Sequence, residues 1–289
     1  MAEADQIKRK TRFVRSFTIM QLMMYIIVFI VVIFVKDVEF TSEFITDNWI
    51  IAVTNGVTAV FTIGLMIRSF SLYKKRKSLQ NAYLAGFFLF TGIPALIITI
   101  ITLFVPTDAN LNYFLSLAIF FLVPGSTVFL STFISETFYG SIDSNARLGQ
   151  LLFFVTQFSA TIANVLGLIL VLREHYATPF TGWVLVLIQI FGGFFILLNV
   201  FLHFLLFYNA VRLSANVDDK RLKTGLALLA LTGVLLGLVF FGRLFNFLLL
   251  DLSILGAYQP IFIYGLDILF FIGYLTMYLG VAIPGRKNQ

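Results

Sequence analysis

The chain contains no cysteine among its 289 residues. This absence excludes disulfide bonds, cysteine nucleophiles and cysteine-ligated metal sites, and it leaves the redox environment open. Charged residues are also scarce: they make up 12% of the chain, where a soluble domain carries about 25%. Apolar residues make up 60%. This composition favours a membrane protein over a soluble one.

Long apolar runs account for most of the chain, and each is long enough to cross a bilayer core, which takes ~20 helical residues. In lipid, only helices and closed barrels satisfy their backbone groups, and uniformly apolar runs of this length indicate helices. We therefore predict an all-α, polytopic integral membrane protein with eight transmembrane helices. The predicted spans are 16–35, 49–67, 83–105, 111–134, 148–172, 181–208, 224–250 and 258–283.

The 20 basic residues are distributed unevenly among the gaps between these spans. If the gaps alternate between the two sides of the membrane and the first is inside, the outside gaps hold only Lys36 and Arg173, and Arg243 lies within a span. Such a bias predicts that both termini are cytoplasmic, and we expect the protein in the plasma membrane. The inside segments hold Lys8, Arg9, Lys10, Arg12, Arg15, Arg68, Lys74, Lys75, Arg76, Lys77, Arg147, Arg212, Lys220, Arg221, Lys223, Arg286 and Lys287.

The net charge of +6 comes from these cytoplasmic flanks. We interpret this positive charge as a signal that sets the membrane topology and as a surface that contacts anionic membrane lipids. We expect no nucleic-acid partner. The predicted organisation is a single membrane domain, with a basic tail over 1–15, a bundle over 16–283 and a short tail over 284–289. The gaps leave no room for a soluble output domain. Any signal would therefore pass to a signalling or assembly partner, or to another copy in a homo-oligomer.

Two charges fall inside predicted spans, Arg243 in the seventh and Asp267 in the eighth. Arg243 precedes the outer end at Leu250 by seven residues, and Asp267 follows Pro260 by seven, so both lie ~10 Å deep at 1.5 Å per residue. Consecutive helices joined by a short loop usually pack together, so the two charges can pair. An intramembrane ion is a candidate site by default, although a buried bridge that only pins two helices is an equal alternative. Asn246, one turn beyond Arg243, could complete the hydrogen bonding.

Further polar candidates lie in the fifth and sixth spans. The fifth span is the most polar, with Gln157 and Asn164 among several hydroxyl residues near its centre. Such residues most often serve helix packing, and lining a hydrated cavity is the alternative. His203 lies toward the inner end of the sixth span without a second ligand at helical spacing, so we predict no metal or haem site. No phosphate-binding loop or nucleophile motif is present, so we do not expect an enzyme.

Three short stretches resemble microbial rhodopsins, and the spans from the second to the eighth have the topology of that seven-helix fold. The stretches are Trp49-Ile50-Ile51, Ile93-Pro94-Ala95-Leu96 and the run from Leu266 to Gly273. The resemblance implies one leading helix followed by a seven-helix bundle. Rhodopsins bind retinal through a lysine four residues after the aspartate of the last helix, and Phe271 stands at that position here. Because no lysine lies inside any span, a retinal Schiff base is excluded, and we predict no cofactor.

An internal duplication is an alternative description of the bundle. The segments 89–93 and 230–234 are similar, and the first and last four spans have the same polarity. Two function classes therefore remain open. The first is a ligand-binding, sensor-like or receptor-like bundle that takes a small or lipophilic ligand. The second is a small transporter or channel in which Asp267 binds a proton or cation and Arg243 supplies the counter-charge.

Overall fold

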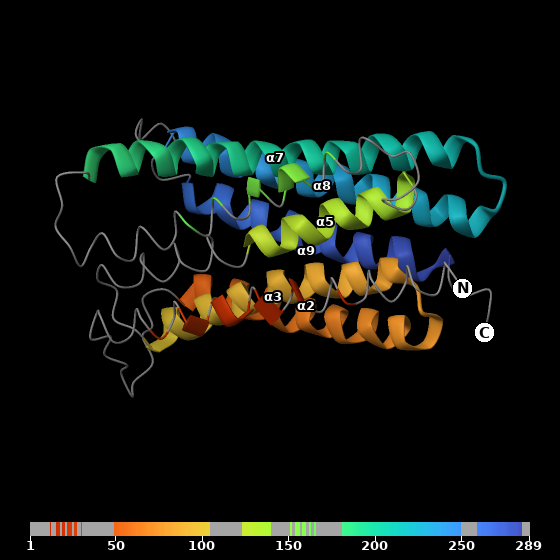
Figure 1. Cartoon of the computed structure of the whole chain (residues 1–289), viewed down its shortest axis with the longest axis horizontal. Coiled ribbons are helices and arrows are strands. Elements are labelled where there is room, and N and C mark those ends of the chain that lie inside the picture. Colours follow the sequence, from red (N-terminus) through yellow and green to blue (C-terminus); the bar gives the residue numbers. More distant parts are fainter. Residues whose placement is uncertain are drawn as a thin grey trace. The chain divides into compact units, whose positions relative to one another are not determined.

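The computed structural model contains helices in nearly every residue that it describes. Those residues are 12, 16–17, 19–20, 22–24, 26–27, 30, 49–104, 123–139, 151, 154–156, 158–159, 162, 165, 181–249 and 259–284. No strand occurs in these ranges. The fold class is therefore all-α, as the apolar spans predict. The helices described over their length are α2 (Trp49–Arg76), α3 (Leu79–Phe104), α5 (Val123–Phe138), α7 (Thr181–Ala215), α8 (Lys220–Leu249) and α9 (Gln259–Ala282), drawn in Figure 1.

Five of the described helices are long and apolar enough to cross a membrane. They coincide with the predicted second, third, sixth, seventh and eighth spans, and α5 begins within the fourth. The first and fifth predicted spans lie largely outside the described residues. The structure therefore supports an integral membrane protein. The five candidate membrane segments are Ala52–Arg76, Leu79–Phe104, Gly193–Ala215, Lys220–Leu244 and Gly265–Ala282.

The helices are longer than the apolar spans at their basic ends. α2 continues past residue 67 to Arg76, and only Lys77 and Ser78 separate it from α3. Likewise, only residues 216–219 separate α7 from α8. Hydropathy detects where side chains leave the hydrocarbon, whereas backbone hydrogen bonding continues in water, so the helices pass the predicted boundaries without a break.

The chain divides into two compact units. Unit 1 comprises Met1–Phe133 and Gln150–Ile188, and unit 2 comprises Ile134–Gly149 and Gln189–Gln289. α2 and α3 pack along each other in unit 1, whereas α8 and α9 pack along each other in unit 2.

The α2–α3 pair in unit 1 depends on a close approach at Gly92. A Cβ added there would lie 2.7 Å from Oγ1 of Thr62, so no larger residue fits without a shift. Small residues at such crossings are typical of membrane helices. The turn between the two helices uses Lys77 with a φ of 54°, a left-handed conformation that lets the chain reverse within two residues.

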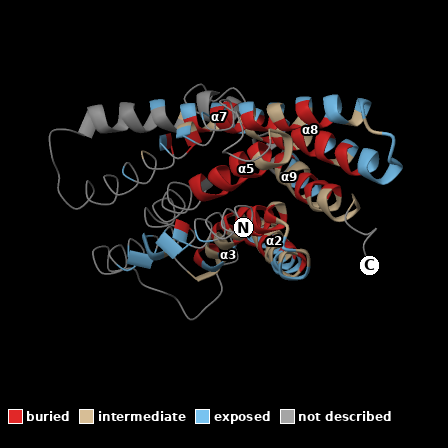
Figure 2. Cartoon of the chain, turned by 45° about the vertical axis from the view of Figure 1, so that its right-hand side comes forward, coloured by how far each residue is buried: buried red, intermediate tan, exposed pale blue. Residues whose placement is uncertain are grey.

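Apolar side chains cover the outward faces of the helices. On α2, exposed valines recur at Val53, Val57 and Val60, one helical turn apart. The opposite face of α2 buries small and polar residues such as Ala59 and Thr62, and Figure 2 shows this contrast of exposed and buried positions along the helices. A water-exposed apolar stripe of this length would favour aggregation, but in lipid it has no such cost. The burial pattern therefore agrees with a membrane location.

Candidate functional site

The α8–α9 contact of unit 2 is a regular antiparallel seam. Near the basic end of α8, a Cβ added to Gly280 of α9 would lie 2.9 Å from the carbonyl oxygen of Gly225. One third of the way along, the hydroxyl groups of Thr232 and Thr276 form a hydrogen bond of 2.9 Å, with both side chains buried. Further on, Gly273 makes room for the side chain of Leu236. The steps of seven and four residues on α8, and of four and three on α9, keep one face of α8 against α9 over several turns.

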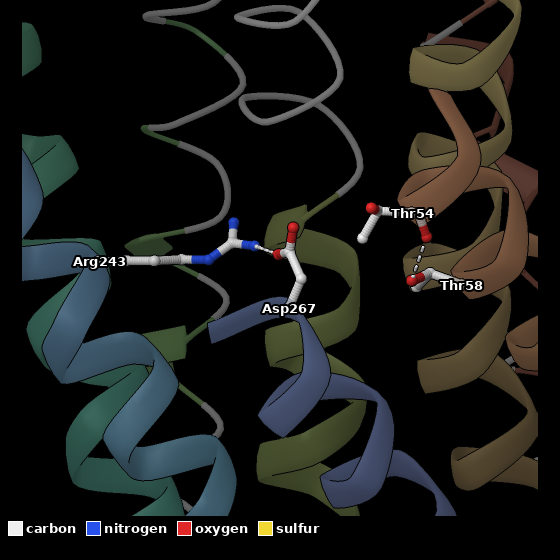
Figure 3. A network of polar contacts seen from close by, with 4 residues as sticks. All are labelled: Thr54, Thr58, Arg243 and Asp267. Carbon is white, nitrogen blue, oxygen red and sulfur yellow. Dashed lines mark hydrogen bonds and ion pairs between the residues drawn. The ribbon is translucent and has the colours of Figure 1, made fainter. Parts of the chain in front are cut away.

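Arg243 and Asp267 lie at the far end of this seam. Nη2 of Arg243 donates a hydrogen bond to Oδ1 of Asp267 at 3.2 Å, as Figure 3 shows. The pairing expected from their equal depth on consecutive helices is therefore present. Because α8 and α9 approach through the same faces along the whole seam, the ion pair needs no distortion of either helix. It extends the packing of the two helices toward the end opposite Lys220.

The ion pair uses little of the bonding capacity of Arg243. The side chain of Arg243 is 48% exposed and that of Asp267 is 19% exposed. A guanidinium has five N–H donors, and among the described residues Arg243 makes one hydrogen bond, to one carboxylate oxygen. The carboxylate neutralises the charge, but most donors point to no described partner. Chemically, this is a group that can bind a second anion without giving up the first.

An aromatic cluster lies beneath the guanidinium. The Arg243 guanidinium lies 5.2 Å from the centre of the Phe270 ring, within the range of a cation–π interaction. Phe270 in turn contacts Tyr274 edge-on at 4.4 Å and Phe240 at 6.0 Å between ring centroids. The Phe270 ring therefore lies on one side of the guanidinium, and Phe240 and Tyr274 support that ring.

His203 of α7 lies deeper in unit 2 and contacts the same aromatic cluster. Its ring stacks on Phe240 with centroids 5.2 Å apart, and the side chain is buried. Nδ1 lies 2.7 Å from the carbonyl oxygen of Asn199, which can only accept, so Nδ1 carries the hydrogen. Nε2 is left as a buried acceptor with no hydrogen-bond partner among the described residues. A chain of ring contacts therefore connects His203 to the ion pair through Phe240 and Phe270.

Close packing fixes the position of His203. Where α7 crosses α8, a Cβ added to Gly233 would lie 2.6 Å from the carbonyl oxygen of His203, whereas one at Gly237 would lie 3.7 Å from Cβ of His203. Gly233 therefore allows the close approach of α7 and α8, whereas Gly237 leaves room for a methyl group. His203 is enclosed by helices and does not face a solvent path in the described part of unit 2.

Helix length gives the level of the ion pair relative to the basic residues at the start of α8. The twenty residues from Lys223 to Arg243 span ~30 Å of helix, which is about the thickness of the hydrocarbon core. If Lys223 marks one boundary, Arg243 lies at or a short distance inside the opposite one. By the same measure, the Gly233 crossing that holds His203 lies ~15 Å from Lys223, at the centre.

The other predicted residues are placed less fully. Asn246 lies on α8 one turn beyond Arg243, but its side chain lies outside the described residues, as do Gln157 and Asn164. Of the polar positions of the fifth span, Thr156 and Ser159 are described and buried; the hydroxyl of Thr156 bonds to that of Ser131 at 2.8 Å, and Oγ of Ser159 has no hydrogen-bond partner among the described residues. That contact supports a packing role for this polar stretch.

The burial of α5 is a feature that our sequence reasoning missed. Every residue from Pro124 to Ser135 is buried, and much of α5 is coloured as buried in Figure 2. Hydroxyl residues recur along this stretch, with Thr127, Ser131 and Ser135 one turn apart, which is unusual for a lipid-facing helix and could have indicated an interior position. They are Ser126, Thr127, Ser131, Thr132 and Ser135.

Hydroxyl groups elsewhere bond mainly within their own helix. In unit 1, Oγ1 of Thr58 donates to the carbonyl oxygen of Thr54 at 2.9 Å, also drawn in Figure 3.

The described residues contain no group of three or more histidine, aspartate or glutamate side chains that could hold a metal ion. Comparison of the chain with models of protein families, with characterised proteins and with solved structures finds no match. The candidate site therefore depends on its own geometry.

Proposed function

We propose that this protein is a ligand-binding, receptor-like helical bundle of eight spans, with both termini cytoplasmic, that passes its signal to a partner protein. The clustered cations at the end of α2 and at the start of α8, with Arg212 at the end of α7, support this orientation, because basic residues are retained on the cytoplasmic side. In that orientation the Arg243–Asp267 pair lies in the outer leaflet, where a ligand can reach it from outside or from the lipid.

One observation carries the proposal: Arg243 is nearly half exposed and donates a single described hydrogen bond. A guanidinium with unused donors can bind a carboxylate or phosphate through two parallel hydrogen bonds. The surrounding surface is apolar, with Ile268 beside Asp267 exposed. The ligand that fits is an amphipathic anion, a lipophilic molecule with a carboxylate or phosphate head.

The same geometry disfavours the transporter alternative. Coupling carboxylates of secondary transporters lie near the bilayer midplane, at the interface of two repeats. Asp267 instead lies at the end of the α8–α9 seam, and its described partner is the cation on the neighbouring helix. A flux assay in proteoliposomes tests this directly, since Asp267→Asn should leave any passive or proton-driven flux unchanged. A loss of flux in that variant would favour transport.

Equilibrium binding of radiolabelled palmitate to the full-length protein in nanodiscs tests the binding proposal. We expect Arg243→Gln to weaken saturable palmitate binding roughly tenfold or more, because a charge-assisted hydrogen bond contributes about 1.5–3 kcal/mol. Asp267→Asn should retain or strengthen binding, since it releases donors of Arg243. Arg212→Gln is the matched control. It removes an exposed arginine near the carboxyl end of α7 and should bind palmitate like the wild type. Equal palmitate binding by Arg243→Gln and the wild type would overturn the proposal.

A further inference from the structure

The basic end of α2 extends well beyond the thickness of a bilayer core. α2 is 28 residues long, or ~42 Å at 1.5 Å per residue. The interval from Trp49, whose side chain is exposed, to Arg68 covers ~28 Å and accounts for the hydrocarbon core. The last two turns therefore stand in the headgroup layer, and they contain Lys74, Lys75 and Arg76.

These cations surround the end of α2 and are held outward. Lys74 and Lys75 are exposed, as is Lys77 in the turn, whereas Arg76 continues the face that packs on α3 and is half-buried. Nζ of Lys74 lies 4.8 Å from the centre of the Phe70 ring, and Nζ of Lys77 lies 6.0 Å from that of Tyr73. The aromatic rings occupy the interfacial level, and the ammonium groups lie over them at the level of lipid phosphates.

The cluster lacks counter-charges of its own. The sequence contains no acidic residue between Asp47 and Asp108, so neither α2 nor α3 carries one. Among the described residues, Lys74, Lys75, Arg76 and Lys77 form no ion pair. The basic stretch that begins α8 differs, because Asp218 and Asp219 immediately precede it. These four successive cations form the longest unbroken run of basic residues in the part of the chain that the structure describes.

We propose that Lys74, Lys75 and Lys77, assisted by Arg76, form a binding site for the phosphate groups of anionic lipids in the leaflet from which α2 emerges. Each lysine near a negatively charged membrane surface favours binding by about fivefold, so three of them together give a preference for anionic over zwitterionic lipid of roughly 100-fold. The site is in unit 1 and is independent of the ligand proposed for Arg243.

Native mass spectrometry of the full-length protein tests this proposal. The protein is released from mixed micelles of phosphatidylcholine and phosphatidylglycerol with matched acyl chains, and the retained lipids are counted. We expect the wild type to retain phosphatidylglycerol preferentially and K74Q/K75Q/K77Q to lose most of that preference. The charge-conserving variant K74R/K75R/K77R should keep it. The matched control K220Q/R221Q/K223Q, which removes three cations next to acids at the start of α8, should also keep it.

Two outcomes would overturn the proposal. The first is an unchanged preference for phosphatidylglycerol in K74Q/K75Q/K77Q, and the second is an equal loss in the α8 control, which would show a general charge effect. If the glutamine variant does not fold, a salt titration of lipid retention by the wild-type protein tests the phosphate site instead. Raising the ionic strength should then reduce phosphatidylglycerol retention while phosphatidylcholine retention stays constant. A salt-independent preference would contradict a phosphate site.

Discussion

Nη2 of Arg243 and Oδ1 of Asp267 lie 3.2 Å apart, joined by one hydrogen bond at the end of a seam that runs the length of α8 and α9. The pair thus has two roles that can be separated. It links two helices whose contact is already secured by Thr232–Thr276 and by glycines. It also leaves a partly exposed guanidinium whose charge is balanced but whose donors are largely unused.

The coupling between the two charges should be modest. Because Arg243 is nearly half exposed, we expect a double-mutant cycle of Arg243→Gln and Asp267→Asn to give an interaction free energy of about 0.5–1 kcal/mol, well below that of a fully buried pair. Reversible unfolding in mixed micelles measures each variant. A coupling above about 3 kcal/mol would mean that the pair is a buried structural bridge and would count against an accessible guanidinium.

The two glycines of α8 should respond differently to alanine. At Gly233 a methyl group would meet the His203 backbone at 2.6 Å, so Gly233→Ala should lower the free energy of unfolding by about 1–3 kcal/mol. At Gly237 the nearest atom is 3.7 Å away, so Gly237→Ala should be neutral or stabilising by up to about 1 kcal/mol. Thermal unfolding of the two variants side by side measures the difference. Equal effects would show that α7 and α8 do not approach at Gly233 as described.

The start of α8 depends on one capping carboxylate. Oδ1 of Asp219 accepts hydrogen bonds from the backbone N–H groups of Arg221 at 2.8 Å and Leu222 at 3.3 Å. Asp219→Ala should therefore cost about 1 kcal/mol of helix stability, whereas Asp218→Ala next to it should cost little. Amide hydrogen exchange in the first turn of α8 reports the difference. If both variants exchange alike, the cap at Asp219 is not a stabilising contact.

The sequence was enough to predict the helical class and the spans that the described residues include, because hydrophobic length is a local property. It also predicted that Arg243 and Asp267 could meet, because equal depth on consecutive antiparallel helices is a counting argument. It could not place Phe270 beneath Arg243 or His203 against Gly233, since those contacts depend on how each helix is rotated about its axis. The extension of α2 to Arg76 was missed for a different reason: hydropathy detects the membrane boundary, and the helix continues past it.

The direct test of the central claim is a distance between a bound anion and Arg243. Rotational-echo double-resonance NMR on membranes containing ¹⁵N-arginine-labelled protein and palmitate labelled with ¹³C at its carboxylate measures that distance. We predict carboxylate–guanidinium dephasing that corresponds to a separation within about 4 Å, the range of a charge-assisted hydrogen bond or ion pair, and its loss in Arg243→Gln. The same dephasing in the Arg243→Gln variant, or none in the wild type at saturating palmitate, would contradict an anion-binding role for Arg243.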